Sequence, residues 1–369
     1  MHGRLQWVIV PAFALALMAG AGIPGLAVES ALPARLSDAE FWKTIQDLSE
    51  PDGRFPSDNL VSNEDTLQVV IPELRRVVKP GGVYVGVGPE QNFTYIAALK
   101  PGLVFIPDIR RGNLHMHLMY KALMELSADR AEFLSRLFSR DRPAGLTASA
   151  SAADLFNAFT ETAPNRERYD TNLTAIYAQL AKHGFKLDDA DAGGIESIYS
   201  RFFAMGPFLS YSSTPTGGRR YPSFAELQMT TDAAGVAHAY LANEDNYKVV
   251  RLLEQNNLIV PLVANFAGPK TVRAIGDWVR ERGGKVTTFY ASNVEQYLFQ
   301  DGIWGQFAEN LSALPTDETS TFIRSCFNTC VNSNINSRVV MLLDSLPAMV
   351  RDHRAGLIRG YYDLLARQR

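Results

Sequence analysis

The sequence predicts an α/β fold in which a mostly parallel sheet carries helices on both faces. Short apolar runs such as VYVGVG at 83–88 and LIVPLV at 258–263 are typical of strands buried inside a sheet. Helical patterns separate these runs, and strands that alternate with helices pair in parallel through crossover connections. A glycine-rich turn, Gly86-Val87-Gly88, directly precedes a predicted helix. Together these observations predict a Rossmann-like sheet.

The predicted elements begin with an amphipathic helix over 38–50 and a second helix that ends near Val78 at a Pro-Gly-Gly stop. They continue with a strand at 83–88, a helix over 89–99, a strand at 103–109, a long helix over 114–139, a helix near 245–255, a strand at 258–268, a helix over 269–282 and a strand that runs into a helix over 285–298.

One domain is expected to span residues 28–369, since a chain of this length can build a single large core. A stretch of small and polar residues opens a mainly helical insertion at about 142–200. The tail, 337–369, is predicted to form one or two C-terminal helices.

The first 27 residues have the pattern of a secretory signal peptide. Arg4 precedes an apolar run over 5–18, and small residues lead to a cleavage position after Ala27. Cleavage would give an exported protein, periplasmic or secreted. The alternative is an uncleaved inner-membrane anchor over residues 5–27, although prolines and glycines weaken this segment as a spanning helix.

Composition excludes some kinds of partner. The 36 basic and 39 acidic residues are interspersed, and no basic run tracks a phosphate backbone, so a small-molecule ligand is expected and nucleic acid is not. Beyond the signal segment no membrane association is expected, and the oligomeric state stays open. Cys326 and Cys330 are predicted to be two small semi-buried residues, since a helical C-x-x-x-C segment does not favour a bond between its thiols. No metal site is predicted.

The ligand of such a sheet lies beyond the carboxyl ends of its strands. Glycines in the first turn allow a close approach, the next helix offers free N–H groups, and an acid twenty residues after Gly88 can accept from ribose hydroxyls. The candidate cofactor-binding residues are Gly86, Gly88, Glu90, Gln91, Asn92, Asp108, Arg110 and Arg111. The alternative is that the glycines only permit tight packing and Asp108 caps the next helix.

Polar side chains at the other strand ends are candidates for substrate binding, because amides and carboxylates can bind a ligand's polar edge. These candidates are Asn63, Asn265, Asn293, Glu295 and Gln296. Asn63 belongs to a segment with Asn59, Ser62 and Glu64 that is expected to fold over the same edge as a lid. Helix capping or a solvated loop is the alternative for each of these residues. No catalytic residue is assigned from the sequence.

The turn, the following helix and Asp108 resemble the cofactor-binding half of class I S-adenosylmethionine-dependent methyltransferases. More closely, GGVYVGVGPEQNFTYIAAL, DIRRGN, PLVANFAGPK and SNVEQYLF resemble a bacterial family of uncharacterised proteins typified by a Leptospira hypothetical protein with a methyltransferase-like Rossmann fold. The resemblance covers roughly residues 38–330. It implies a methyltransferase-like fold and S-adenosylmethionine as cofactor, with Gly86 and Gly88 facing its methionine part and Asp108 its ribose.

Three positions depart from the fingerprints of these families. Tyr84 stands where methyltransferases carry an acid, Glu90 replaces their third glycine, and Gln91 replaces the last glycine of the dinucleotide fingerprint. Glu90 would repel phosphates, which argues against a dinucleotide more than against a sulfonium cofactor. A sequon at Asn92 falls in the same turn, where a glycan would block the site, and this favours a bacterial origin.

Two functions follow from these observations. The first is a methyltransferase-like enzyme that acts on a small molecule in the strand-end cleft. The second is a non-catalytic exported solute-binding protein that retains the cleft on a degenerate Rossmann core. Export favours the second, because S-adenosylmethionine is made and kept in the cytoplasm.

Overall fold

A six-stranded mixed sheet forms the centre of the computed structural model, which describes residues 32–211, 220–328, 330 and 338–367. Its order is β3-β2-β1-β4-β5-β6, in which β1 to β5 pair in parallel and β6 runs antiparallel to β5. The strands are β1 (Val83–Gly86), β2 (Leu103–Asp108), β3 (Ile259–Val263), β4 (Val286–Tyr290), β5 (Thr321–Phe327) and β6 (Val339–Ser345). The predicted α/β class with a mostly parallel, Rossmann-like sheet is confirmed.

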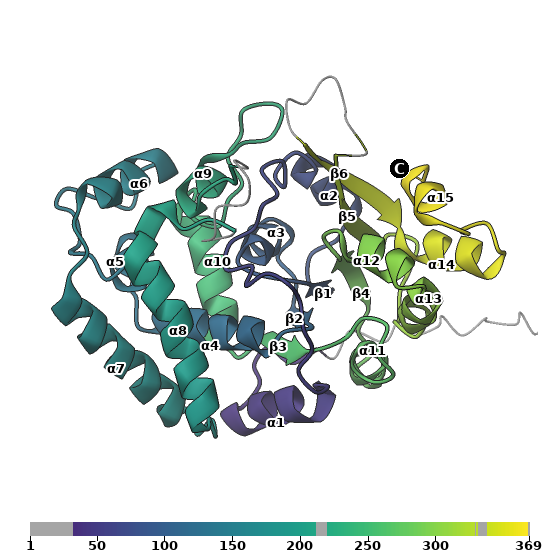
Figure 1. Ribbon diagram of the computed structural model, residues 1–369, viewed down its shortest axis with the longest axis horizontal. Coiled ribbons are helices and arrows are strands. Elements are labelled where there is room, and N and C mark those ends of the chain that lie inside the picture. Colours follow the sequence, from purple (N-terminus) through teal and green to yellow (C-terminus); the bar gives the residue numbers. More distant parts are fainter. Residues whose placement is uncertain (1–31, 212–219, 329, 331–337, 368–369) are drawn as a thin grey trace, which may run out of the picture.

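Helices cover both faces of this sheet, as Figure 1 shows. On one face α3 (Gln91–Leu99), α4 (Arg111–Glu125) and α10 (Glu244–Gln255) pack against one another, and α4 also contacts β2 and β3. α2 (Ile71–Val77) contacts α3. The side chains of α3 are buried along its whole length, which explains why its sequence contains no charged residue.

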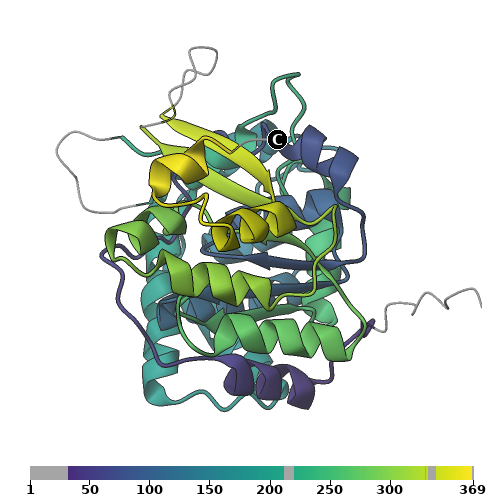
Figure 2. The same cartoon turned by 90° about the vertical axis from the view of Figure 1, so that its right-hand side faces the viewer.

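On the other face α11 (Thr271–Glu281), α13 (Trp304–Ser312) and α14 (Leu346–Arg354) lie across the strands, one above the other in Figure 2. α1 (Asp38–Leu48) contacts both β3 and α11 at the end of this stack. Ser37 caps α1 in a capping box with Glu40, as an S-x-x-E start predicts.

Further helices form a layer outside α4, to the left of the sheet in Figure 1. They are α5 (Arg130–Leu137), α6 (Ala152–Glu161), α7 (Arg166–Lys182), α8 (Asp189–Met205), the short 3-10 helix η1 (Gly206–Phe208) and α9 (Phe224–Met229). α7 and α8 contact α4, so this layer packs on a helix and not on the sheet. The region expected as a helical insertion is therefore attached through α4.

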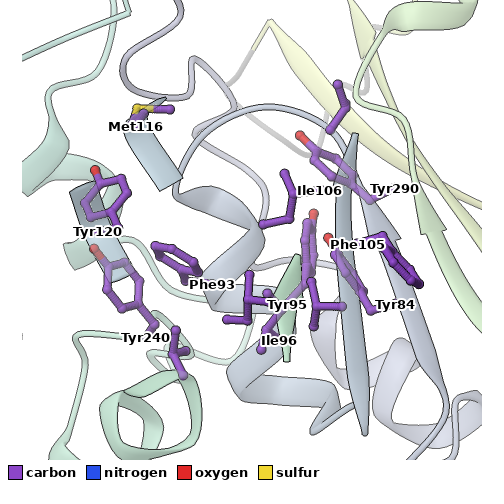
Figure 3. Packing of buried hydrophobic residues seen from close by; sticks show 14 of the residues in the cluster. Tyr84, Phe93, Tyr95, Ile96, Phe105, Ile106, Met116, Tyr120, Tyr240 and Tyr290 are labelled. Carbon is purple, nitrogen blue, oxygen red and sulfur yellow. The ribbon is translucent and has the colours of Figure 1, made fainter. Parts of the chain in front are cut away.

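Aromatic side chains fill the space between the sheet and α3, α4 and α10 (Figure 3). The ring of Phe93 stands edge-on to Tyr120 and Tyr240, with centroids 5.4 and 5.3 Å away. On β4, Tyr290 packs 5.2 Å from Tyr95 of α3. Offset and edge-on ring pairs of this kind stabilise the core by about 1 kcal/mol each beyond the area that they bury.

Three sequence expectations differ from the structure. The long helix expected over 114–139 is two helices, because Asp129 accepts a hydrogen bond from Glu132 N and caps a new helix, α5. The tail expected as helices begins with β6, whose apolar run pairs with β5 along its whole length, and continues with α14 and α15 (Tyr361–Leu365). The sequence did not predict β5 either.

The expectation of two unpaired cysteines was wrong. Cys326 lies in β5, and it forms a disulfide with Cys330 just beyond the strand. The prediction assumed a helix. Cys326 instead lies in an extended strand, and the two Cα atoms are 5.8 Å apart, within the range that a disulfide bridges.

Candidate functional site

The strand order reverses between β1 and β4, and a cleft of about 660 Å³ opens at the carboxyl ends of these strands and their neighbours. Doubly wound sheets bind ligands at this switch point. A segment without helix or strand, residues 54–64, contributes one wall of the cleft. Of the predicted site residues the structure brings these to the lining: Asn63, Gly88, Gln91, Asp108, Arg110, Asn265, Asn293 and Gln296.

The other predicted residues lie outside the lining. They are Gly86, Glu90, Asn92, Arg111 and Glu295. Gly86, Glu90 and Asn92 belong to the glycine turn and the packing behind it, Glu295 is turned into the core, and Arg111 points toward the helical layer outside α4.

Asn92 fixes the glycine turn from within. Its amide Nδ2 donates to the carbonyls of Val87, Gly88 and Pro89 at 2.9, 3.2 and 2.8 Å, and its Oδ1 accepts from the hydroxyl of Tyr84 at 2.9 Å. A Cβ at Gly86 would lie 2.1 Å from this Oδ1 and would collide with it. Gly86 therefore makes room for the protein's own side chains, and not for a ligand.

Gly88 is the glycine that reaches the cleft. Its φ of +86° belongs to the left-handed region, where other residues are strained. The neutral ring of His117 on α4 donates from Nε2 to the carbonyl of Gly88 at 2.9 Å. Burial lowers the pKa of His117 to about 4, so this ring stays uncharged and holds the turn against α4.

Glu90 is completely buried behind the turn. Neither carboxyl oxygen has a hydrogen-bond partner of normal geometry, and burial raises the pKa of Glu90 to about 8, an effect that nearby backbone N–H groups only partly offset. The hydroxyls of Tyr120 and Tyr240 are close enough for Glu90 to raise their pKa values further. Glu90 is thus a neutral core carboxyl at pH 7 and not a cofactor contact.

Asp108 lies at the end of β2 and faces the cleft, but its carboxylate is largely occupied. Arg110 donates to it from Nε at 3.0 Å, from Nη2 at 2.9 Å and from its backbone N–H at 2.9 Å. The Arg110 guanidinium also donates to the carbonyls of Ser57 and Asp58 in the wall segment. A carboxylate accepts about four hydrogen bonds, so Oδ2 of Asp108 keeps one acceptor position for a ligand.

Arg111 instead forms a bidentate pair with Asp191 of α8, at 2.7 and 2.9 Å. His115 reaches the same carboxylate at 2.8 Å. Burial raises the pKa of Asp191, but the hydrogen bonds from Arg111 and His115 outweigh this effect and lower the pKa to about 2. Arg111 therefore holds α8 against the first turn of α4.

Glu64 is the acid that the sequence placed only in a lid. Its side chain is buried at the cleft, and its carboxylate accepts from Tyr290 Oη at 2.6 Å and from the hydroxyls of Ser292 and Ser325. Gln91 donates to Tyr290 Oη at 3.2 Å and extends the network to the glycine turn. Burial raises the pKa of Glu64 although all three hydroxyls favour its charged form. These five residues join the ends of β1, β4 and β5.

The residues after β3 and β4 have local partners. Asn265 Oδ1 accepts from Ala267 N at 3.0 Å, as in an Asx-turn. Asn293 precedes α12 (Val294–Gln300) but makes no capping hydrogen bond, so its amide and that of Gln296 face the cleft. Ser292 has a φ of +52°, a strained conformation for a serine. Strain of this kind occurs preferentially where a side chain must be aimed at a site.

Glu295, the remaining predicted residue, is turned into the core. Burial raises the pKa of Glu295 to about 7, and the nearby Arg324 opposes this effect. No group of three or more His, Cys, Asp or Glu side chains that could hold a metal occurs in the described part of the chain. Within the same residues no helix has both the length and the apolar character needed to cross a bilayer.

Aromatic rings surround the opening of the cleft. Phe55 of the wall segment stands edge-on to Tyr297 of α12 with centroids 5.3 Å apart, and Tyr211 lies 5.1 Å from Tyr221. Phe266 and Phe327 also contribute to the lining. The cleft thus combines a polar floor with an aromatic rim, which is the usual composition of a small-molecule site.

A family model described as a domain of unknown function, DUF7790, matches residues 59–192 and 216–346, which is more than half of the chain. The chain belongs to the DUF7790 family. The matched segments contain all six strands, the acids Glu64 and Asp108, and the α12 residues of the cleft. No curated protein matches the chain.

Sequence reasoning missed the partners of Glu64. Tyr290, Ser292 and Ser325 meet only because β4 and β5 are parallel neighbours whose carboxyl ends share one edge. Since β5 was not predicted, Ser325 could not be placed. The run TFIRSCF contains aromatic and β-branched residues typical of strands, but its Arg324-Ser325 pair breaks both an apolar run and a strict alternation.

Proposed function

We propose that this DUF7790 protein binds a small molecule in the cleft at the switch point and acts on it as a methyltransferase-like enzyme. The observation that carries the proposal is Glu64, a buried carboxylate with a raised pKa at the floor of a ligand-sized cleft. Ionisable groups perturbed in this way inside a cleft are candidates for acid–base chemistry. The proposal retains the resemblance to class I methyltransferases and to the Leptospira-type bacterial family.

The residues of the cleft fit the cofactor that this resemblance implies. Gly88 offers a backbone that a ligand can approach closely, and Oδ2 of Asp108 keeps one acceptor position for a ribose hydroxyl. S-adenosylmethionine, when bound, supplies a methyl group on a sulfonium centre. Glu64 would take the proton that the substrate's nucleophilic atom loses as it accepts that methyl group, and the Tyr290, Ser292 and Ser325 hydroxyls would stabilise the carboxylate beforehand.

A second candidate is a non-catalytic solute-binding protein. The Asp108–Arg110 pair favours it, because the acid expected to bind ribose is already neutralised by a bidentate guanidinium. Glu90 and Gln91 favour it as well, since Glu90 replaces a glycine of the methyltransferase fingerprint and Gln91 replaces a glycine of the dinucleotide fingerprint.

We further propose that the protein is exported, which favours the solute-binding candidate because S-adenosylmethionine is kept in the cytoplasm. The predicted signal peptide lies outside the described residues, so support comes from the Cys326–Cys330 disulfide. Disulfides persist in the periplasm and outside the cell and are rare in the cytoplasm. Fractionation of the source cells should place the mature chain outside the cytoplasm, and a full-length cytoplasmic chain would exclude export.

Titration calorimetry with S-adenosylmethionine and with S-adenosylhomocysteine separates the two functions. Heat with either compound supports the enzyme, and Asp108→Ala should abolish it. Absence of heat with both excludes the methyltransferase version and leaves the solute-binding version. Mass spectrometry of ligand retained through native purification then identifies the solute.

A further inference from the structure

We infer that the ligand of the cleft carries a protonated amine, and that Glu64 binds this ammonium group. The inference rests on the proposed function only in assuming that the cleft binds a small molecule; it holds for an enzyme and for a solute-binding protein alike. It follows from the hydrogen bonds, the charges and the aromatic rings around Glu64.

The hydrogen bonds leave one position on the carboxylate open. Oε1 accepts from Ser292 and Ser325, and Oε2 accepts from Tyr290. A carboxylate has about four acceptor sites and, when ionised, donates nothing. The remaining site on Oε2 therefore suits a ligand group that donates a hydrogen bond.

The charges around Glu64 are not balanced by the protein. Among the residues that the structure describes, no Lys, Arg or His lies within ion-pair distance of its carboxylate. The ionisable groups that it influences are Tyr84, Tyr95, Tyr290 and Glu295, which carry no positive charge. A buried carboxylate is stabilised by a cation, and a ligand can supply that cation where the protein does not.

Neither arginine of the cleft lining takes this role: Arg54 is exposed and forms no ion pair with Glu64, and Arg110 is engaged elsewhere. Arg110 directs its Nε and Nη2 donors at Asp108 and its Nη1 at the carbonyls of Ser57 and Asp58. All of its guanidinium nitrogens are therefore engaged on the opposite side of the cleft.

The aromatic rim favours a cation over an anion. The rings of Phe55, Tyr297, Tyr211 and Tyr221 lie at the opening, and the faces of aromatic rings attract ammonium groups. An amine attached to an apolar or aromatic body would fill the cleft between the rim and Glu64.

Three probes of nearly equal size test the inference: 2-phenylethylamine, 2-phenylethanol and phenylacetate. Ligand-observed NMR with the mature chain at pH 7.5 measures their affinities. We expect the amine to bind about tenfold more tightly than the alcohol, since a hydrogen bond between two charged groups is stronger than one to a neutral donor. The acid should bind most weakly, because its charge repels that of Glu64.

Glu64→Gln tests the residue itself. The variant should bind amine and alcohol within about threefold of each other, because the amide keeps the shape and removes the charge. Asp301→Asn is the matched control: Asp301 also lines the cleft, so the substitution removes one negative charge there and should leave the preference for the amine intact. If Glu64→Gln does not fold, the order of the three probes on the unaltered protein still decides.

The outcomes separate this inference from the proposed function. Equal binding of amine and alcohol, tighter binding of the acid, or an unchanged preference in Glu64→Gln overturns the ammonium assignment while the cleft remains a ligand site. No binding of any probe at millimolar concentration, together with no ligand retained in native purification, removes the cleft as a ligand site and the proposed function with it.

Discussion

Asp108 and Glu64 face the same cleft from opposite sides of the switch point, and each uses three of its acceptor positions. The donors to Asp108 are a guanidinium and a backbone N–H, whereas the donors to Glu64 are three neutral hydroxyls. Asp108 is therefore neutralised within the protein, and Glu64 is hydrogen-bonded without being neutralised. A count of hydrogen bonds alone does not reveal this difference.

The chemistry of the cleft is therefore expected near Glu64 and not near Asp108. The nucleotide-like fingerprint directs attention to the end of β2, where the acid already has its cation. The unbalanced charge lies at the ends of β4 and β5 and is contributed by a segment that precedes the sheet. The predictions below test this asymmetry, from the largest expected effect to the smallest.

Removing the guanidinium should make Asp108 resemble Glu64. Arg110→Met leaves a buried carboxylate without its cation and releases the carbonyls of Ser57 and Asp58, so the free energy of unfolding at pH 7 should fall by about 4 kcal/mol. Urea denaturation measures the change. The double variant Asp108→Asn/Arg110→Met should recover most of the loss, and a loss below about 1 kcal/mol in the single variant would show that the pair contributes little.

Glu90 is a third buried acid, with neither a cation nor hydroxyl donors. Its pKa is about 8 in the folded chain and about 4.5 when unfolded, so the folded chain binds the extra proton. The stabilisation that comes from protonated Glu90 is fully present below pH 4.5 and is lost as the pH rises toward 8. By pH 7 the free energy of unfolding has fallen by about 3 kcal/mol through this effect.

Glu90→Gln has no carboxyl group to titrate and should not show this loss of stability. The free energy of unfolding of the variant, relative to that of the unaltered protein, should therefore rise between pH 4.5 and pH 7. Denaturant unfolding across this range measures the difference. The exposed Glu167→Gln is the control and should show no such trend. A flat difference for Glu90→Gln would mean that Glu90 is already solvated or partnered.

The Cys326–Cys330 disulfide belongs to the Glu64 side of the cleft, because Ser325 immediately precedes it. Replacing both cysteines by alanine should lower the free energy of unfolding by about 2 kcal/mol, the loop-closure contribution of a short crosslink. Guanidinium unfolding with and without reductant measures it: the unaltered protein in reductant should match the variant, and no response to reductant would contradict the disulfide.

Tyr297 should affect binding more than folding. Tyr297→Ala removes an edge-on contact with Phe55, which should lower the free energy of unfolding by less than about 1 kcal/mol. The affinity for 2-phenylethylamine should fall by about fivefold. Tyr362→Ala, at an exposed position outside the cleft, is the control and should change neither. Equal affinities for the two variants would show that the rim does not contact the amine.

Local sequence patterns were sufficient for the first four strands, because each is a short run rich in apolar and β-branched residues. They failed for β5 and β6, whose polar residues Arg324, Ser325 and Asp344 interrupt the apolar pattern. These side chains are buried and paired in the structure, with Arg324 bonded to the carbonyls of Leu364 and Arg367. Such partners are distant along the chain, so no local pattern predicts them.

The sequence predicted which edge of the sheet carries the cleft. It did not predict the roles of the residues there. Arg110 and Arg111 are adjacent and chemically identical, yet one binds Asp108 at the cleft and the other binds Asp191 on α8. The two side chains point in different directions because α4 begins at Arg111, and Arg110 precedes the helix in an extended conformation. Glu64 was visible only as a polar residue of a lid, since its three donors come from β4, the residues just after it, and β5, all more than two hundred residues away.

The buried amide of Asn92 has a practical consequence for producing this protein. Asn92 begins an Asn-Phe-Thr sequon, and its nitrogen donates to three carbonyls of the glycine turn. The asparagines of the two other sequons, Asn172 and Asn310, are buried as well. An oligosaccharide attached to any of them before folding would have to occupy the core. Yeast or mammalian secretion should therefore yield misfolded glycoprotein, whereas a host without N-glycosylation, or enzymatic inhibition of that step, should give the native chain.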